Sequence, residues 1–268
     1  MTILVTGATG NVGRLVVDQL LAMGAGGVRA LTNDPKKAAL PAEVEVFEGY
    51  VGRPETVPAA LEGVKRMYLA PLPQTAREIA ALAREAGVER IVDMAGYGWW
   101  RSVEEAVEES GVAWTHLRPG EFMATSLIWA PQIRATGAVR DAHPDAEDAE
   151  NAPIDLVDIA TAAAVALLGD GHVGGAYELT GPEKISRADG VRLIGEALGR
   201  EVPLVELTHE EAVEELSSVM GEYAGWYLEG KAELVNHPQE PVPTVEEVTG
   251  RPAMTFAEWA IEHADAFR

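Results

Sequence analysis

The chain opens on a short apolar run that is followed at once by glycines and then by a helical pattern. Residues 2–6 read Thr-Ile-Leu-Val-Thr, a β-prone segment, and residues 7–13 read Gly-Ala-Thr-Gly-Asn-Val-Gly. This pattern predicts a strand, a tight turn and a helix at the start of the chain. The apolar positions that predict the helix recur at three- and four-residue spacing and are Val12, Leu15, Val16, Leu20 and Met23.

Strand-like and helix-like segments then alternate as far as residue 118. Further strands are predicted over 28–32, 44–47, 66–70, 90–94 and 113–117, and helices over 54–61, 75–86 and 103–109, with a short helix opened by Asn33-Asp34-Pro35. This order predicts an α/β fold with a doubly wound, parallel Rossmann sheet and right-handed crossovers. Because ligands of such sheets lie outside the carboxyl ends of the strands, we expect a site in the loops near Gly7, Asn33, Gly49, Ala70, Ala95 and Pro119.

The chain from about residue 121 onward has a less regular, mostly helical pattern. Helices are predicted over 121–130 and 209–220, from Ser186 to Gly199 and near Val245 and Phe256, and residues 154–158 lead into an alanine-rich helix that runs through Leu168. Strands are predicted over 176–179 and 203–207, and an exposed acidic loop over 140–151. The sequence contains no linker and no internal repeat. We therefore expect residues 1–268 to form a single domain, in which the residues after about 121 form a small, mostly helical C-terminal lobe.

Gly7, Gly10 and Gly13 have the spacing of a dinucleotide-binding turn. The first glycine allows the sharp turn, the second lets the backbone approach a pyrophosphate, and the third lets the helix lie close to the sheet. The free amides and the positive dipole end of the helix then face the phosphates. The alternative is a tight turn between strand and helix that binds no ligand.

Composition and net charge indicate which kinds of ligand and partner the protein can bind. The 268 residues are 47% hydrophobic, carry a net charge of −22 and include no cysteine. The acidity argues against nucleic acid, which needs a basic face, and the lack of cysteine excludes disulfides and thiolate catalysis. The sequence shows no apolar run of membrane-spanning length, no basic segment typical of a signal peptide, and no metal-ligand spacing among its six histidines. We expect a cytoplasmic protein, monomeric or homodimeric, that acts on a small molecule and binds no metal, membrane or nucleic acid.

With these segments placed, the chain resembles the NmrA-like branch of the atypical short-chain dehydrogenase/reductase superfamily, which includes quinone oxidoreductases and triphenylmethane reductases. The stretches that carry the resemblance are 3–13, 117–122 (Leu-Arg-Pro-Gly-Glu-Phe), 153–160 and 177–182. The resemblance implies a nicotinamide dinucleotide along Gly7, Thr9, Gly10, Asn11, Val12 and Gly13. It further implies that the adenine ribose lies near Asn33, the nicotinamide near Ala70, Pro71, Pro119 and Gly120, and the substrate under the C-terminal lobe.

Asn33 departs from the family pattern, because relatives that use NADP(H) tend to carry an arginine there. An asparagine can bind a ribose hydroxyl but cannot pair with a 2′-phosphate in the bidentate manner of arginine. Asp34 would repel that phosphate, whereas Lys36 and Lys37 can compensate. The alternative is that Asn33 only caps a helix. The family favours NADP(H) over NAD(H) as the cofactor.

Tyr50 is a second departure, since relatives often have an acidic residue at that position. Its ring can stack on the adenine or pack within its own loop.

The catalytic residues depart most from the superfamily, which uses Tyr-x-x-x-Lys with a nearby serine after the fifth strand. Tyr97 follows that strand here, and Arg101 stands where the lysine is expected. Tyr97 is therefore the candidate proton donor; the alternative is a proton from water or from a cofactor hydroxyl. The aromatic and apolar candidates for a substrate pocket are Trp99, Trp100, Phe122, Met123 and Trp226, each of which can instead belong to a core. His116 is expected to be a packed core residue.

These features predict an NAD(P)H-dependent reductase of a small planar conjugated, quinone or ketone substrate. Two alternatives remain on the same fold: a dinucleotide-sensing regulator without turnover, and a redox-neutral isomerase or cyclase.

Overall fold

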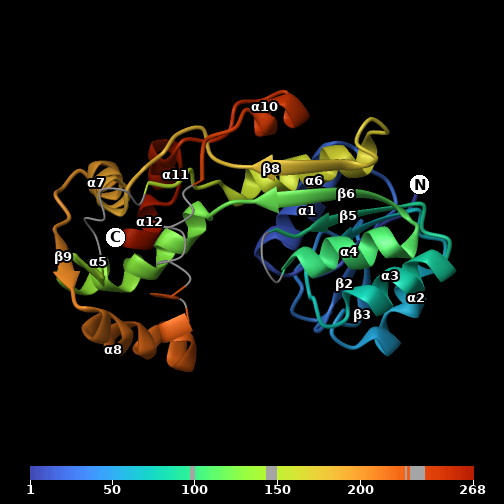
Figure 1. The fold of residues 1–268 in the computed structure, drawn as a ribbon, viewed down its shortest axis with the longest axis horizontal. Coiled ribbons are helices and arrows are strands. Elements are labelled where there is room, and N and C mark those ends of the chain that lie inside the picture. The colour runs from blue at the N-terminus through green and yellow to red at the C-terminus, as the bar shows by residue number, and fades with distance from the viewer. Residues whose placement is uncertain (97–99, 143–149, 227, 230–238) are drawn as a thin grey trace. The chain divides into compact units, whose positions relative to one another are not determined.

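The computed structural model describes residues 1–96, 100–142, 150–226, 228–229 and 239–268. The chain divides into two compact units, and it passes between them several times (Figure 1). The first unit comprises Met1–Pro119, Leu156–Leu179 and Thr244–Arg251, and the second comprises Gly120–Asp155, Thr180–Pro243 and Pro252–Arg268.

The first unit is built on a seven-stranded sheet in the order β3-β2-β1-β4-β5-β6-β8, and every neighbouring pair is parallel. The strand order reverses beside β1, where β2 lies on one side and β4 on the other. This is the switch point at which doubly wound sheets bind ligands, so the predicted α/β fold is confirmed. The strands are β1 (Ile3–Val5), β2 (Val28–Thr32), β3 (Glu45–Glu48), β4 (Arg66–Leu69), β5 (Arg90–Met94), β6 (Ala113–Pro119) and β8 (Gly175–Leu179).

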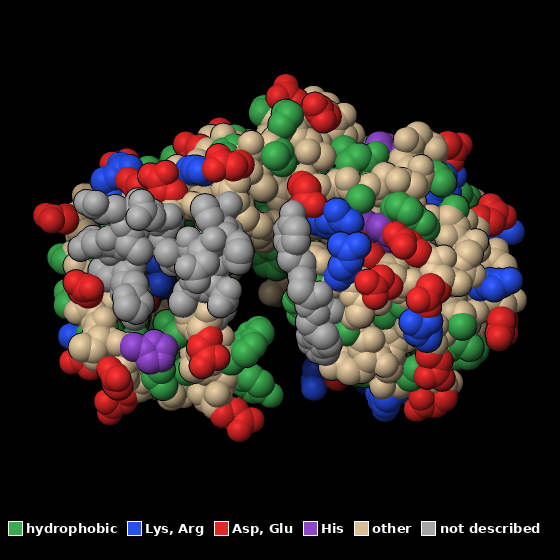
Figure 2. All heavy atoms as spheres, in the orientation of Figure 1, with side chains coloured by type: hydrophobic (Ala, Val, Ile, Leu, Met, Phe, Trp, Pro, Cys, Tyr) green, Lys and Arg blue, Asp and Glu red, His purple; other side chains and the backbone are tan. Residues whose placement is uncertain are grey.

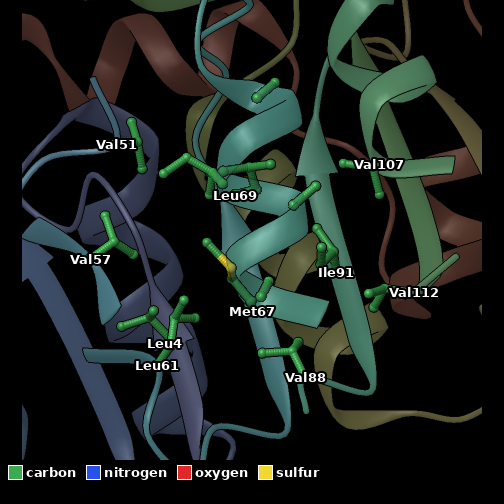
Figure 3. Close-up of a cluster of buried hydrophobic side chains, with 14 of the residues drawn as sticks. Leu4, Val51, Val57, Leu61, Met67, Leu69, Val88, Ile91, Val107 and Val112 are labelled. Carbon is green, nitrogen blue, oxygen red and sulfur yellow. The ribbon is translucent and has the colours of Figure 1, made fainter. Parts of the chain in front are cut away.

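Helices cover both faces of this sheet. One face packs against α3 and α4 through Leu4, Met67, Leu69, Ile91 and Val107, which point into one apolar cluster (Figure 3). On the other face α1 packs against α6, an alanine-rich helix that is buried along most of its length. The helices of this unit are α1 (Asn11–Ala22), η1 (Pro54–Thr56), α2 (Pro58–Leu61), α3 (Ala76–Glu85), α4 (Arg101–Ser110), α6 (Leu156–Leu168) and α10 (Thr244–Thr249).

The second unit is mostly helical, and it does not take in the whole chain after residue 121, because Leu156–Leu179 and Thr244–Arg251 belong to the first unit. Its core includes Trp129, Phe256, Trp259 and Phe267, and its two strands, β7 (Val139–Ala142) and β9 (Leu204–Leu207), are parallel. Its helices are η3 (Met123–Trp129), α5 (Ala130–Thr136), α7 (Arg187–Leu198), α8 (His209–Met220), η4 (Gly221–Tyr223), α11 (Phe256–Glu262) and α12 (Ala264–Phe267). Within the described ranges, no helix of either unit is long and apolar enough to cross a bilayer.

Three predicted helices differ from the structure. The segment opened by Asn33 forms a single turn, because Ala39 adopts a left-handed φ of 46° and Pro41 disfavours a helical conformation in the residue before it. The predicted helix over 54–61 is split into a 3₁₀ turn and a short α-helix, with a proline at the start of each. Most of the predicted helix over 121–130 is 3₁₀ rather than α.

The start of α7 supplies a prediction about stability. The Ser186 Oγ accepts a hydrogen bond from the Asp189 amide (3.0 Å), and the Asp189 carboxylate accepts one from the Ser186 amide (3.3 Å). Ser186→Ala leaves the Asp189 amide without its hydrogen-bond acceptor, so we expect the free energy of unfolding to fall by about 1 kcal/mol. Urea titration of the whole chain measures the change. Ser217→Ala, within α8, serves as the control and should shift stability by less than about 0.5 kcal/mol; equal losses in the two variants would contradict the prediction.

Candidate functional site

The turn between β1 and α1 has no room for side chains at two of its glycines. Gly7 has a φ of +60°, and a Cβ added there would lie 2.9 Å from the Ala70 Cβ. A Cβ added at Gly13 would lie 2.2 Å from the Gly7 carbonyl oxygen. Helix α1 therefore packs directly against the turn that precedes it, which is the close approach that the glycine spacing predicts.

The same turn is held by the ends of the neighbouring strands. The Thr6 hydroxyl donates to the Tyr68 carbonyl (3.0 Å) and accepts from the Ala70 amide (2.8 Å). On the other side, the Ala8 amide donates to the Leu31 carbonyl (3.2 Å). Hydrogen bonds to β2 and to the β4 end thus fix the turn at the switch point before any ligand arrives.

The first turn of α1 leaves donors free. Gly10 caps the helix without a side-chain hydrogen bond, and the first turn contains no acidic residue. Within the described ranges, no acceptor is found for the amides of Asn11, Val12 and Gly13. Free amides at the positive end of a helix suit an anion such as a pyrophosphate.

A basic residue that the sequence reasoning missed lies at the ends of β2 and β3. The Arg53 guanidinium donates to the Asn33 side-chain oxygen (3.3 Å), and Lys37 forms an ion pair with Asp34 (3.2 Å). The Tyr50 ring packs over Gly52, where an added Cβ would lie 2.4 Å from the ring, and 40% of Tyr50 is exposed. The one signal in the sequence was a cation three residues beyond Tyr50, in the loop after a predicted strand.

The remaining predicted site residues are spread over both units. In the first unit, Ala70 and Pro71 follow β4, Pro119 ends β6, and Trp100 precedes α4 with 39% of its surface exposed. Tyr97 and Trp99 lie outside the described residues.

Four predicted site residues belong to the second unit. Gly120 lies against the side chain of Gln239, whose oxygen accepts from the Glu121 amide (2.9 Å). Phe122 is half-buried and Met123 is buried in the apolar core, whereas 69% of Trp226 is exposed.

A buried ionisable pair lies inside the first unit. The His116 Nδ1 is 2.7 Å from the Asp93 carboxylate, and both side chains are fully buried. Burial raises the pKa of Asp93 to about 6, although the hydrogen bond and charge of His116 oppose the increase. Burial alone lowers the pKa of His116, but Asp93, Glu104 and Glu108 together raise it above its ordinary value. The prediction that His116 is a packed core residue is confirmed, and its partnership with Asp93 is new.

The described side chains contain no group of three metal ligands. Backbone amides of the β1–α1 turn and the side chains of Arg53 and Lys37 lie at the strand ends of the first unit.

Several known proteins resemble this chain in sequence or in fold. A family model described as NAD(P)H-binding matches residues 7–102. Over 99% of both chains, the protein is 37% identical to a (4-alkanoyl-5-oxo-2,5-dihydrofuran-3-yl)methyl phosphate reductase of Streptomyces griseus subsp. griseus and 36% identical to an NAD(P)H azoreductase of Xenophilus azovorans. An NADPH-dependent quinone oxidoreductase of Escherichia coli, solved with NADPH, has a similar fold, with a TM-score of 0.86 and 24% identity over 97% of this chain and 99% of that one.

The sheet order and the glycine turn define an α/β protein that binds a nicotinamide dinucleotide. The chain belongs to the family of NAD(P)H-binding reductases that includes the furanone phosphate reductase and the azoreductase, and it is an oxidoreductase.

Proposed function

We propose that this oxidoreductase uses NADPH to reduce a small, planar, conjugated acceptor of the quinone, azo or conjugated-ketone type. The observation that carries the proposal is the fixed β1–α1 turn at the switch point, in which glycines clear a surface and backbone amides remain free. In this proposal those amides bind the pyrophosphate. Thr9, Asn33, Lys37 and Tyr50 lie toward the adenosine end, and Ala70, Pro71, Pro119 and Gly120 toward the nicotinamide end.

The substrate class is supported by the names of the two curated relatives, one an azoreductase and the other a reductase of an alkanoyl-dihydrofuranone phosphate. Acceptors of these kinds contain an electron-poor double bond that takes a hydride at one end and a proton at the other. The reduced nicotinamide supplies the hydride when it is bound. Aromatic and apolar side chains would hold the flat acceptor, and the candidates are Trp99, Trp100, Phe122, Met123 and Trp226.

Phe122 has the most suitable surroundings among these candidates. It lines a small pocket of the second unit together with Trp129, Phe256 and the polar side chains of Ser126 and Arg187. Glu121 and Ser186 also line this pocket, so it offers a small ligand both aromatic stacking surface and polar partners. Tyr97 remains the proposed proton donor.

Cofactor oxidation with a panel of acceptors tests the proposal. The whole chain is mixed with NADPH or NADH and with a benzoquinone, an azo dye, a conjugated enone or an unconjugated ketone, and the loss of absorbance at the reduced-nicotinamide band is followed. We expect turnover with the conjugated acceptors at least about 100-fold faster than with the unconjugated ketone, because a conjugated acceptor delocalises the negative charge that hydride addition creates, whereas the ketone concentrates it on one oxygen.

Calorimetry with each nucleotide in the absence of acceptor separates the outcomes. Tight binding without oxidation by any acceptor would replace the proposal with a dinucleotide-sensing regulator. Conversion of a substrate without net cofactor oxidation would indicate an isomerase or cyclase. A preference for NADH above about tenfold, equivalent to about 1.4 kcal/mol, would overturn the choice of NADPH.

A further inference from the structure

We propose that Arg53, positioned by Asn33, is the residue that recognises the 2′-phosphate of NADP(H). The inference rests on the proposed function, because it requires the adenosine end of the nucleotide to lie beside the end of β2. It assigns cofactor specificity to the loop after β3, 20 residues away from Asn33 along the chain.

The loop that carries Arg53 is held in place from several sides. The Gly49 amide donates to the Thr32 carbonyl (2.9 Å), so the loop begins against the end of β2. The Arg53 amide donates to the Tyr50 carbonyl (2.8 Å), and the Thr56 hydroxyl donates to the Arg53 carbonyl (2.7 Å). These bonds fix the backbone of Arg53 beside Asn33 without using its guanidinium.

Two glycines let the loop pass close to its neighbours. A Cβ at Gly49 would lie 2.7 Å from the Leu31 side chain and 2.9 Å from the Thr56 carbonyl oxygen. A Cβ at Gly52 would lie 2.4 Å from the Tyr50 ring. Because neither position has a side chain, the loop can lie close to β2, and Arg53 is then within hydrogen-bond distance of Asn33.

The charge of Arg53 is available to a ligand. Of the carboxylates that the structure describes, none lies within 4.0 Å of its guanidinium, although the net charge is −22 and acidic side chains are spread over the surface (Figure 2). Arg14 of α1 and Arg29 of β2, by contrast, pair with Asp18 and Glu45. Asn33 accepts from one nitrogen of Arg53, and the other donors of the guanidinium fork remain to bind a phosphate.

The carboxylate of Asp34, which would repel a 2′-phosphate, is paired with Lys37 in the same turn. It pairs with the Lys37 ammonium (3.2 Å) and accepts from the Lys37 amide (3.3 Å). This pairing removes the electrostatic objection that the sequence raised, and it also makes Lys37 a weaker candidate than Arg53 for the phosphate.

Nucleotide titration of Arg53→Gln tests the inference. The probes are NADPH, NADH, adenosine 2′,5′-bisphosphate and AMP, measured by calorimetry on the whole chain. We expect the variant to bind NADPH and the bisphosphate about 10- to 100-fold more weakly, because a charge-assisted bidentate contact is lost. Its affinities for NADH and AMP should stay within about twofold of the wild type, and Arg53→Lys should give an intermediate loss.

Two control variants make the result specific. Arg84→Gln removes one positive charge from an exposed arginine of α3 and should leave all four affinities unchanged. Lys36→Gln tests the neighbouring lysine as the rival phosphate ligand. An unchanged NADPH-to-NADH ratio in Arg53→Gln, an equal loss for both nucleotides, or a larger change in Lys36→Gln would overturn the inference. Failure of the wild type to bind either dinucleotide would instead overturn the proposed function.

Discussion

Gly13→Ala is expected to weaken binding of NADPH and NADH by more than about 100-fold, equivalent to about 2.7 kcal/mol. The added methyl group would lie 2.2 Å from the Gly7 carbonyl oxygen and 2.8 Å from its carbon, both of them backbone atoms in a turn that cannot rotate aside. Helix α1 must therefore move away from the sheet, and its free amides move away from the pyrophosphate. Both nucleotides lose affinity together because they share that pyrophosphate. Calorimetry with each nucleotide measures the loss.

Two other glycines, Gly10 in the turn and Gly26 outside it, should give smaller effects than Gly13. A Cβ at Gly10 would lie 3.2 Å from the Gly7 carbonyl oxygen, so Gly10→Ala should cost less than Gly13→Ala. Gly26 has no atom within 4 Å of an added Cβ and no left-handed φ, which makes Gly26→Ala the control with unchanged affinity. Gly13→Ala with wild-type affinity, or a loss confined to one nucleotide, would show that the turn does not hold the pyrophosphate.

The sheet was predictable because its parallel strands are buried on both faces. Buried strands of this kind appear in the sequence as short apolar runs, such as Ile3-Leu4-Val5 and Ile91-Val92, separated by helical periodicity. The glycine spacing likewise predicted the close packing of α1, since only a residue without Cβ fits at Gly13. These features depend on residues that are adjacent in the sequence.

Features that depend on distant residues were not predictable in the same way. Arg53 meets Asn33 only because β2 and β3 pair in parallel, and Asp93 meets His116 only because β5 and β6 are in register there. The turn after Asn33 was missed for a different reason, since a left-handed Ala39 is not encoded by any local preference of alanine. The role of Tyr97 stays a prediction, because that residue lies outside the described ranges.

His116→Leu is expected to lower the free energy of unfolding at pH 7 by about 3 kcal/mol or more. His116 is the hydrogen-bond partner of a fully buried carboxylate, whose second oxygen, Oδ1, has no partner in the part of the chain that the structure describes. Without His116, Asp93 must either stay charged in an apolar interior or take up a proton. Urea titration of the whole chain measures the loss. Adding Asp93→Leu should recover much of it, because the carboxylate left without its hydrogen-bond partner is then removed; a double variant less stable than His116→Leu would contradict this.

The same pair sets the direction of a pH dependence. The folded protein holds a proton on Asp93 above its ordinary pKa of 3.8, up to about 6, and on His116 above its ordinary pKa of 6.5. The unfolded chain binds fewer protons over both ranges, so this pair stabilises the fold most at low pH and its contribution declines as pH rises, by at most about 1.4 kcal/mol per pH unit. Asp93→Asn should flatten that decline between pH 3.8 and about 6, the interval over which the pKa of Asp93 is raised. Asp170→Asn is the control, because Arg66 holds the pKa of Asp170 below its usual value and its effect is confined to acid. An undiminished decline in Asp93→Asn would assign the pH dependence to other groups.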